Sequence, residues 1–227
     1  MFQPVTHVLF DLDGLLINTE DLYADGFQQI ASKYGKEFTF KLKCKIMGMQ
    51  SHELAECIIK ELGLPLTVEE FQSQTRVLFR GLYTKCKILP GVEKLLRHLY
   101  YHNIPMGLAT SSGKETVDLK VANHQELFDL FTYRTLGSSD PEVKRGKPYP
   151  DIFIVAANKF LEKPSPDKCL VFEDSVNGVK AARAAGMQVV MVPDPQLDLK
   201  FTTEATLVLN SLENFDPELF SLPPYKC

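Results

Sequence analysis

VTHVLFDLDGLLINTE, residues 5–20, is the stretch from which the fold of this chain can be argued. The apolar run at 8–10 is rich in strand formers and stops abruptly at the sequence DLDG. A short apolar run that ends in turn residues is typical of a strand buried on both faces, as in a parallel sheet. Because side chains alternate along a strand, Asp11 and Asp13 project to the same side. The stretch therefore predicts two neighbouring carboxylates where a buried strand ends.

These two aspartates admit a structural and a chemical interpretation. Asp and Gly are favoured turn residues, and a turn at the end of a strand needs nothing more. Two carboxylates this close repel each other, however, and a metal ion or a shared proton would relieve the repulsion. Open α/β sheets also bind their ligands at the carboxyl ends of strands. The motif alone leaves both interpretations open.

Length and composition describe an ordinary globular protein. The chain has 227 residues, of which 44% are apolar and 24% are charged. These values fit one large α/β domain or a domain with an insert. The net charge of −4 gives no support for binding a nucleic acid polymer through its phosphates. No apolar run reaches the length that crosses a membrane, and no signal peptide is visible.

The cysteines indicate a reducing compartment. They are odd in number, widely spaced and form no C-x-x-C pair: Cys44, Cys57, Cys86, Cys169 and Cys227. This pattern is typical of reduced thiols rather than of a disulfide framework. We therefore expect a cytoplasmic protein without a membrane segment, and nothing in the sequence indicates a protein partner.

Helical spacing replaces the strand pattern between residues 19 and 86. Apolar residues recur three and four positions apart at 22–34 and again at 54–62. Thr67 followed by Glu70 is a capping box that begins a further helix. This segment predicts an all-helical unit inserted after the first strand.

The rest of the chain alternates strands with helices. Strands are predicted at 105–109, 133–136, 169–172, 188–192 and, as a last edge strand, 205–209. Helices are predicted at 92–102, 114–127, 150–160 and 176–185. Such alternation is typical of an α/β fold with a doubly wound, mostly parallel, Rossmann-like sheet. We expect residues 1–17 and 88–227 to form this core and residues 18–87 to form the helical insert.

Polar residues follow several of the predicted strands. They are Asp11 and Asp13, Thr110 and Ser111, Lys147 in the loop GKPYPD, and Glu173 and Asp174. Since the carboxyl ends of parallel strands share one edge of the sheet, these side chains can meet there. Each set also has a structural alternative, namely a helix cap for the hydroxyls and acids and a solvated loop for the lysine. Oxygen ligands without Cys or His favour Mg²⁺, and the lysine and hydroxyls favour a phosphate.

Four motifs in this order, FDLDG, LATSS, GKPYPD and FEDS, resemble those of the haloacid dehalogenase-like hydrolases. The helical insert after the first motif resembles the cap domain of that superfamily. Two longer stretches, KCLVFEDSVNGVKAARAAGMQVVMVPD and ATLVLNSLENFDPELFSLP, resemble its pseudouridine-5′-phosphatase group. The resemblance covers the whole chain. It implies a phosphatase for a small phosphorylated metabolite, with pseudouridine 5′-monophosphate as the expected substrate.

The resemblance also implies a role for each motif residue. Asp11 is expected to be the nucleophile that forms an aspartyl phosphate, and Asp13 the general acid and base. Mg²⁺ is expected on Asp11, the backbone carbonyl of Asp13, and Asp174, with Glu173 beside them. The residues expected to take part in catalysis are Asp11, Asp13, Thr110 and Lys147, and those expected to bind the phosphate are Leu12, Asp13, Thr110, Ser111 and Lys147.

Other functions use similar motifs. A phosphatase for other sugar phosphates fits the same residues. Phosphoglucomutases of the superfamily carry a cap histidine where this chain has Tyr23 and an arginine where it has Ser51, so we expect phosphate release rather than isomerisation. A dehalogenase is disfavoured because that branch does not keep the second aspartate of the first motif. A catalytically silent binding protein is expected to have lost a motif residue, and none is lost. Asn18 replaces a frequent aspartate but lies outside the motifs.

Overall fold

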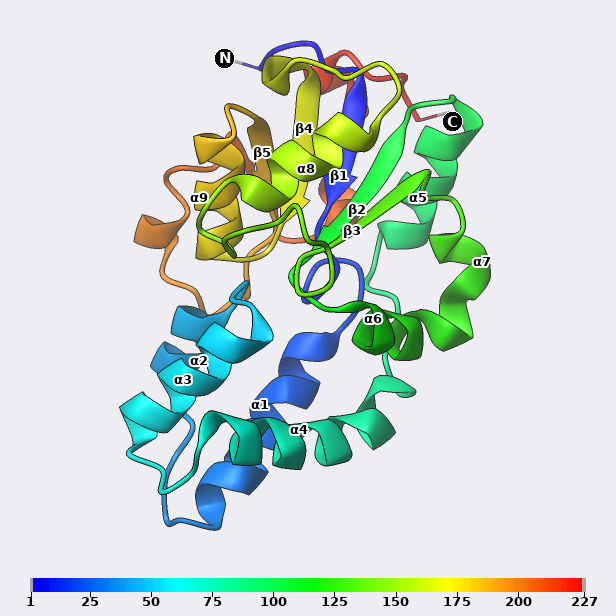
Figure 1. Cartoon of the computed structure of the whole chain (residues 1–227). Coiled ribbons are helices and arrows are strands. Elements are labelled where there is room, and N and C mark those ends of the chain that lie inside the picture. Colours follow the sequence, from blue (N-terminus) through cyan, green and yellow to red (C-terminus); the bar gives the residue numbers. More distant parts are fainter. Residues whose placement is uncertain (1, 226–227) are drawn as a thin grey trace.

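The computed structural model describes residues 2–225 and contains a central parallel sheet (Figure 1). The described strands lie in the order β3-β2-β1-β4-β5-β6, and each pair of neighbours is parallel. Their bounds are β1 (His7–Phe10), β2 (Met106–Thr110), β3 (Tyr133–Leu136), β4 (Cys169–Glu173), β5 (Gln188–Met191) and β6 (Leu207–Val208). This is the strand order of a doubly wound sheet, so the predicted fold class is confirmed.

The first strand, β1, is buried on both faces. Val8 and Phe10 belong to the hydrophobic cluster on one side of the sheet, and Leu9 belongs to the cluster on the other side. None of the three has exposed surface. Burial of each such side chain contributes about 1.5–3 kcal/mol to folding. Both faces of the strand therefore require apolar residues, which explains a run without polar alternation.

Helices cover both faces of the sheet. On the face of Leu9 lie α8 (Asp151–Lys159) and α9 (Val176–Ala184), whose alanines complete the hydrophobic cluster there. On the face of Phe10 lie α5 (Val92–Tyr101), α6 (Lys114–Val121) and α7 (Gln125–Phe128). Short 3₁₀ turns occur at Ala122–His124, Pro166–Lys168, Leu199–Phe201, Leu212–Asn214 and Pro217–Phe220.

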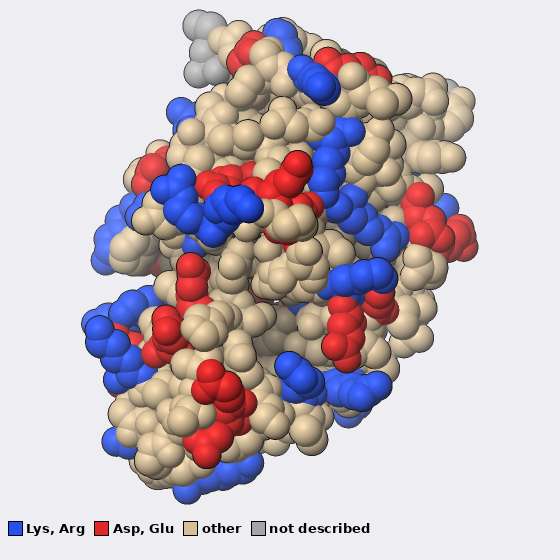
Figure 2. All heavy atoms as spheres, viewed as in Figure 1, with Lys and Arg blue, Asp and Glu red and all other residues tan. Residues whose placement is uncertain are grey.

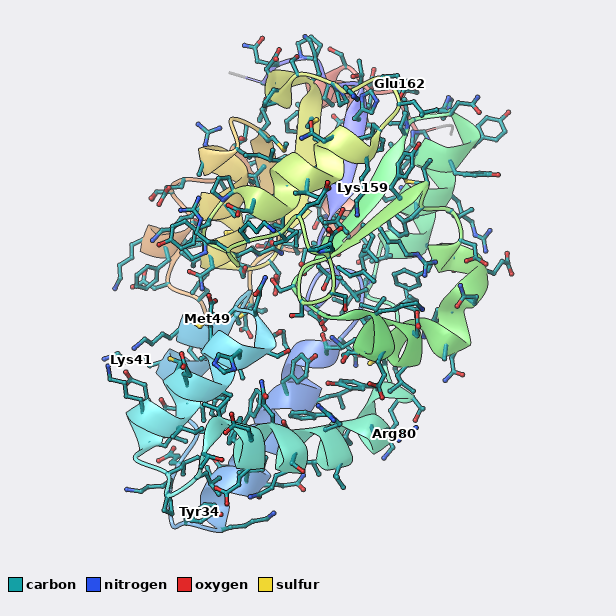
Figure 3. All side chains as sticks on the ribbon, in the orientation of Figure 1. Tyr34, Lys41, Met49, Arg80, Lys159 and Glu162 are labelled. Carbon is teal, nitrogen blue, oxygen red and sulfur yellow. The ribbon has the colours of Figure 1, made fainter. Side chains whose placement is uncertain are left out.

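Four further helices form a separate unit beyond the carboxyl edge of the sheet, which we call the cap (Figure 1). They are α1 (Thr19–Ser32), α2 (Phe40–Ile46), α3 (Ser51–Leu62) and α4 (Val68–Tyr83). The cap has a hydrophobic cluster of its own, which includes Phe27, Phe71 and Phe79. Figure 3 shows Met49 at the end of the cap that faces the sheet and Tyr34 at the far end.

The predicted capping box begins α4. Thr67 Oγ1 accepts a hydrogen bond from Glu70 N at 3.1 Å, and Glu70 Oε2 accepts one from Thr67 N at 2.8 Å. The two bonds satisfy backbone donors that have no partner within the helix. The start of α4 was therefore readable from the spacing of two residues.

The chain passes twice between the sheet and the cap, and the two passages are bonded to each other. Asn18 N donates to Lys87 O at 3.1 Å, and Lys87 N donates to Asn18 Oδ1 at 2.7 Å. Leu89 N donates to Leu16 O at 3.0 Å. The side chain of Asn18 thus joins the outgoing passage to the returning one.

One predicted helix is interrupted. The helix predicted at 114–127 ends at Val121, and a 3₁₀ turn separates it from α7. Within that turn, Asn123 Nδ2 donates to Thr84 O at 2.9 Å, and His124 Nε2 lies 2.9 Å from Cys86 O. These side chains bind the segment that returns from the cap. Helical spacing contains no information on such a long-range contact, so the break was not predicted.

The structure also bears on membrane-spanning segments and on the cysteines. No helix within 2–225 has both the length and the apolar character needed to cross a bilayer. The cysteines with free thiols are Cys44, Cys57, Cys86 and Cys169. Cys227, the fifth cysteine of the sequence, lies outside the described residues.

Two helical glycines provide a matched test of cap packing. A Cβ at Gly26 in α1 would collide with the Phe79 ring of α4, whereas a Cβ at Gly81 in α4 has nothing within 4 Å. Gly81→Ala is therefore expected to stabilise the fold by ~0.5–1 kcal/mol, as alanine does in an open helix. Gly26→Ala is expected to destabilise it by ~1–3 kcal/mol because the ring must move. Urea denaturation measures both values, and equal shifts would contradict the close packing of α1 on α4.

Candidate active site

Asp11 and Asp174 lie where the order of the strands reverses. β1 and β4 are neighbours in the sheet although they are far apart in the sequence, and these aspartates directly follow the two strands. Doubly wound sheets bind their ligands at such a switch point. Carboxylate oxygens of Asp11, Glu173 and Asp174 lie within 4.8 Å of one another, and all three residues are buried. The structure thus brings together acids from two of the sequence motifs.

Lys147 provides the positive charge beside these acids. Its Nζ donates to Asp11 Oδ1 and to Glu173 Oε1, each at 2.5 Å, and its side chain is 1% exposed. Burial disfavours the ammonium, but the two carboxylates outweigh burial and raise the pKa of Lys147 above its usual value. The lysine of the loop GKPYPD is therefore a buried partner of Asp11 rather than a solvated loop residue.

Glu173 has both of its carboxylate oxygens bound by the protein. Besides Lys147, it accepts hydrogen bonds at 3.0 Å from Asp174 N, Ser175 N and Ser175 Oγ. A Cβ at Gly178 would overlap this carboxylate, so glycine lets Glu173 lie against the N-terminus of α9, which favours negative charge. With these bonds, Glu173 is suited to hold Lys147 in place.

Asp13 is held by a different set of groups. Lys120 Nζ from α6 donates to Asp13 Oδ1 at 2.5 Å, and Tyr23 OH makes a longer bond of 3.5 Å to the same oxygen. The hydroxyls of Ser112 and Thr110 donate to Asp13 Oδ2 at 3.0 and 3.4 Å. Burial opposes ionisation, but Lys120 and its hydrogen bond prevail and place the pKa of Asp13 below its ordinary value.

Ser111 binds the cap rather than another motif residue. Its Oγ donates to Gly48 O at 2.8 Å. A Cβ at Gly48 would lie 2.9 Å from Ser175 Oγ and 3.5 Å from Lys147 Cδ. The cap loop therefore lies directly over the lysine that contacts Asp11. The side chain of Leu12 lies inside the hydrophobic core. The polar groups that Leu12 could offer to a phosphate are therefore those of its backbone.

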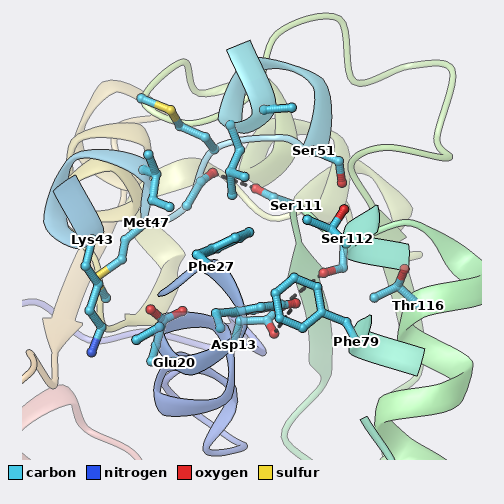
Figure 4. Close-up of a pocket in the computed structure, with 18 of the residues that line it drawn as sticks. Asp13, Glu20, Phe27, Lys43, Met47, Ser51, Phe79, Ser111, Ser112 and Thr116 are labelled. Carbon is cyan, nitrogen blue, oxygen red and sulfur yellow. Dashed lines mark hydrogen bonds between the residues drawn. The ribbon is translucent and has the colours of Figure 1, made fainter. Parts of the chain in front are cut away.

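A pocket lies between the cap and the carboxyl edge of the sheet. Figure 4 shows Phe27 and Phe79, which belong to cap helices, close to Asp13, Ser111 and Ser112, which follow strands of the sheet. In the space-filling view a hollow separates these two parts of the molecule (Figure 2). The cap side of the pocket is mostly apolar and includes several aromatic rings, and its polar members include Glu20 and Lys43. The pocket can therefore hold a phosphate next to the sheet and a partly apolar group next to the cap.

The buried acids outnumber the positive charge beside them. Three carboxylates share one ammonium group, so full ionisation leaves two negative charges without a partner. Burial raises the pKa of Asp11 to about 7, and burial with Glu173 and Glu20 nearby raises the pKa of Asp174 well above its usual range. A divalent cation would balance the two charges, and closely spaced carboxylate oxygens suit Mg²⁺. The residues present therefore fit the predicted metal.

Sequence reasoning missed Lys120 and Glu20. Val117, Lys120 and Val121 are the buried residues of α6, and a lysine at helical spacing within an apolar face indicates a paired charge. That signal was present in the sequence. Glu20 lines the pocket, and burial raises its pKa to about 7. Its position in the first turn of α1 is an ordinary place for an acidic residue and gave no comparable signal.

Comparisons with known proteins show which family this chain resembles. The family described as haloacid dehalogenase-like hydrolase matches residues 8–192. A probable pseudouridine-5′-phosphatase of Drosophila melanogaster is 50% identical over 225 residues, which cover 99% of this chain and 97% of the relative. A (DL)-glycerol-3-phosphatase of Arabidopsis thaliana is 41% identical and is matched over 98% of this chain and 93% of its own length.

Solved structures share the fold. A β-phosphoglucomutase of Clostridium difficile has a TM-score of 0.78 at 24% identity, and the match covers 94% of each chain. A putative β-phosphoglucomutase of Thermotoga maritima has a TM-score of 0.70 at 28% identity, covering 95% of this chain and 97% of the other. With the family match over residues 8–192 and a relative that is half identical over nearly its whole length, this chain belongs to the haloacid dehalogenase-like hydrolases.

Proposed function

We propose that this chain is a Mg²⁺-dependent phosphatase that forms an aspartyl phosphate on Asp11. The placement of Asp11 is the observation that supports the proposal most. Its carboxylate lies at the switch point of the sheet, accepts a hydrogen bond from Lys147 and lines the pocket beneath the cap. The substrate is a small phosphorylated metabolite, and no nucleic acid, membrane or protein partner enters the proposal.

In the first step, a carboxylate oxygen of Asp11 attacks phosphorus opposite the leaving group. A new O–P bond forms while the bond from phosphorus to the substrate oxygen breaks. Because a phosphomonoester and a carboxylate are both anionic, the ammonium of Lys147 reduces their repulsion and stabilises the transition state. The hydroxyls of Thr110 and Ser111, with the backbone at Leu12, are suited to hold the phosphate oxygens.

Asp13 acts next to Asp11 as general acid and then as general base. In the first step it gives its proton to the leaving alkoxide, and in the second it takes a proton from the water that hydrolyses the acyl phosphate. Such transfers contribute ~10²–10⁴-fold to rates. The ion pair with Lys120 favours the ionised form, which suits the second step. An anionic phosphate beside Asp13 raises its pKa, which favours the protonated form needed for the first step.

Mg²⁺ would be held by the side chains of Asp11 and Asp174 and by the backbone carbonyl of Asp13. When bound, it neutralises the charge of the phosphate and of the acids around it. Glu173 belongs to the same acidic cluster, but its oxygens are bound by Lys147 and by the start of α9. We therefore assign it the role of holding Lys147.

The cap closes the pocket during the first step. Besides the bond from Ser111 to Gly48, Asn177 Nδ2 donates to Met47 O at 2.8 Å. An ion pair of 2.7 Å joins Lys43 of the cap to Asp194 of the core. We propose that residues 18–87 move as one domain against 1–17 and 88–227, about the paired passages at Leu16–Asn18 and Lys87–Leu89. Closure excludes water from the nucleophile until the leaving group has departed.

Pseudouridine 5′-monophosphate is the substrate that we propose. The aromatic cap wall of the pocket suits a planar base, and the relative that is 50% identical is named for this activity. A second candidate, a phosphatase for glycerol phosphate, is supported by the relative from Arabidopsis thaliana. A phosphomutase is disfavoured because Tyr23 and Ser51 line the pocket where mutases of this family carry a histidine and an arginine.

Metal dependence is the first prediction of this proposal. EDTA should abolish phosphate release, Mg²⁺ should restore it, and Ca²⁺ should substitute poorly because its larger, looser coordination misplaces the phosphate. Mg²⁺ should also raise the melting temperature of the metal-free protein, since it binds the folded state alone. Asp174→Asn should lose both effects, whereas the exposed Asp198→Asn should keep them. Full activity after exhaustive chelation would rule out the proposed metal site.

Substrate choice is the second prediction. With Mg²⁺ present, a phosphate-release screen should give the highest kcat/KM for pseudouridine 5′-monophosphate among nucleoside, sugar and glycerol monophosphates. β-Glucose 1-phosphate with a catalytic amount of the bisphosphate should give inorganic phosphate and no isomer, because Ser51 cannot hold a second phosphate as an arginine does.

Two results of this screen would count against the proposal. Accumulation of glucose 6-phosphate faster than inorganic phosphate would make the chain a mutase. A clear preference for glycerol phosphate over every nucleotide would move the substrate assignment to the second candidate.

A further inference from the structure

Lys120 is a buried lysine that the proposed mechanism does not use. It projects from α6, is 1% exposed, and donates to Asp13 Oδ1 at 2.5 Å and to Ser112 Oγ at 2.8 Å. A lysine is almost never this buried without a charged partner. Its amine is therefore committed to Asp13 in the same way as that of Lys147 is committed to Asp11.

Lys120 lies behind Asp13 as seen from the pocket. Asp13, Thr110 and Ser112 are among the residues that line the pocket, and Lys120 is not. Because Lys120 binds Oδ1, the carboxylate cannot rotate freely, and Oδ2 stays on the side of the Thr110 and Ser112 hydroxyls. Lys120 thus fixes which carboxylate oxygen bonds to the amine and which bonds to the hydroxyls of the pocket wall, although Lys120 does not itself line the pocket.

The cap supplies two further neighbours of the amine. Lys120 Nζ lies 5.1 Å from the centre of the Tyr23 ring in α1 and 5.3 Å from that of the Tyr83 ring in α4. Both distances are within the range of cation–π attraction. The ammonium is therefore enclosed by a core carboxylate, a core hydroxyl and two rings of the cap, and its position is fixed when the cap lies as it does here.

We propose that Lys120 is a positioning residue that holds the Asp13 carboxylate in the direction required for proton transfer to and from the substrate. The proposal rests on the proposed function, since it assumes that Asp13 exchanges protons with the leaving group and with water. Each aspartate of the first motif then has its own lysine. Lys147 from the core loop bonds to Asp11, the nucleophile, and Lys120 from α6 bonds to Asp13, the general acid and base.

The test separates proton transfer from the other parts of the reaction. Lys120→Met keeps the length of the side chain and removes its charge. With Mg²⁺ and substrate in excess, the first turnover is measured on an alkyl monophosphate, ribose 5-phosphate. The first and later turnovers are measured on 4-nitrophenyl phosphate, whose leaving group departs without a proton. Lys114→Met is the matched control, because Lys114 lies on the same helix, is exposed and forms its ion pair with the exposed Asp118.

Lys120→Met is expected to slow the first turnover of ribose 5-phosphate by about 10²-fold, the cost of a misplaced catalytic group. The first release of nitrophenol should stay within about threefold of wild type, since it needs no proton. Later turnovers of nitrophenyl phosphate should slow, because the second step still needs Asp13 as a base. Lys114→Met should leave all three rates unchanged.

Two outcomes would overturn the inference, and a third would concern the proposed function instead. If Lys120→Met slows the first turnover of both substrates equally, Lys120 supports the fold alone. Unchanged rates mean that Asp13 needs no positioning. If the wild-type protein with Mg²⁺ releases phosphate from neither of these substrates nor from pseudouridine 5′-monophosphate, the proposed function itself fails.

Ser112→Ala keeps the test decisive if Lys120→Met does not fold. It removes a neutral neighbour of both Lys120 and Asp13 and leaves every charge in place. It should reduce the alkyl rate more than the first nitrophenol release, in the same direction as Lys120→Met. Where Lys120→Met folds, Lys120→Arg, which retains the positive charge, should recover part of the alkyl rate that Lys120→Met loses. The proposal is contradicted if neither Lys120→Met nor Ser112→Ala slows the alkyl substrate more than the first release of nitrophenol.

Discussion

The shared lysine of three buried acids is the interaction on which the site depends. Asp11, Glu173 and Asp174 come from two neighbouring strands of the sheet and are buried together, and Lys147 bonds to the first two. Buried charges are tolerated only when they are paired. One lysine cannot neutralise three carboxylates, so the cluster favours a divalent cation. We propose that this cation then offsets the repulsion between the acids and an anionic phosphate.

The cap connects this charged edge to a selective pocket. Its helices have their own hydrophobic cluster and join the core through two bonded passages. Polar contacts at Gly48 and Lys43 bring the cap against the core, while its aromatic residues face the space above Asp13. We therefore propose that the sheet supplies chemistry that any phosphomonoester could use and that the cap decides which leaving group can enter.

Local sequence signals predicted the parts of the structure that depend on nearest neighbours. The apolar run at 8–10 predicted β1, and the pair Thr67 and Glu70 predicted the start of α4. The acids after β1 and β4 could be placed together because parallel strands end at one edge. The short helix α2 and the break after Val121 were not predicted. The break follows from contacts with distant segments, and α2 has alternating lysines that obscure helical spacing.

The site was predicted least well where partners come from different motifs. Lys147 was placed at the phosphate, but its bond to Glu173 depends on how a loop folds back over β4. Lys120 was overlooked because it belongs to no motif, although its spacing with Val117 and Val121 marks it as buried. Ser111 was expected at the phosphate and is bonded to the cap in this structure. Motifs identify chemical groups, whereas their pairing is decided by the fold.

The most direct test of the account is the capture of phosphate on Asp11. The protein is mixed with Mg²⁺ and substrate, quenched in acid during turnover, digested and analysed by mass spectrometry. The account predicts the mass of one phosphoryl group on the peptide that contains Asp11, and no such peptide from a folded, inactive Asp11→Asn variant. Near-normal hydrolysis by Asp11→Asn, or phosphate trapped on another residue, would contradict it.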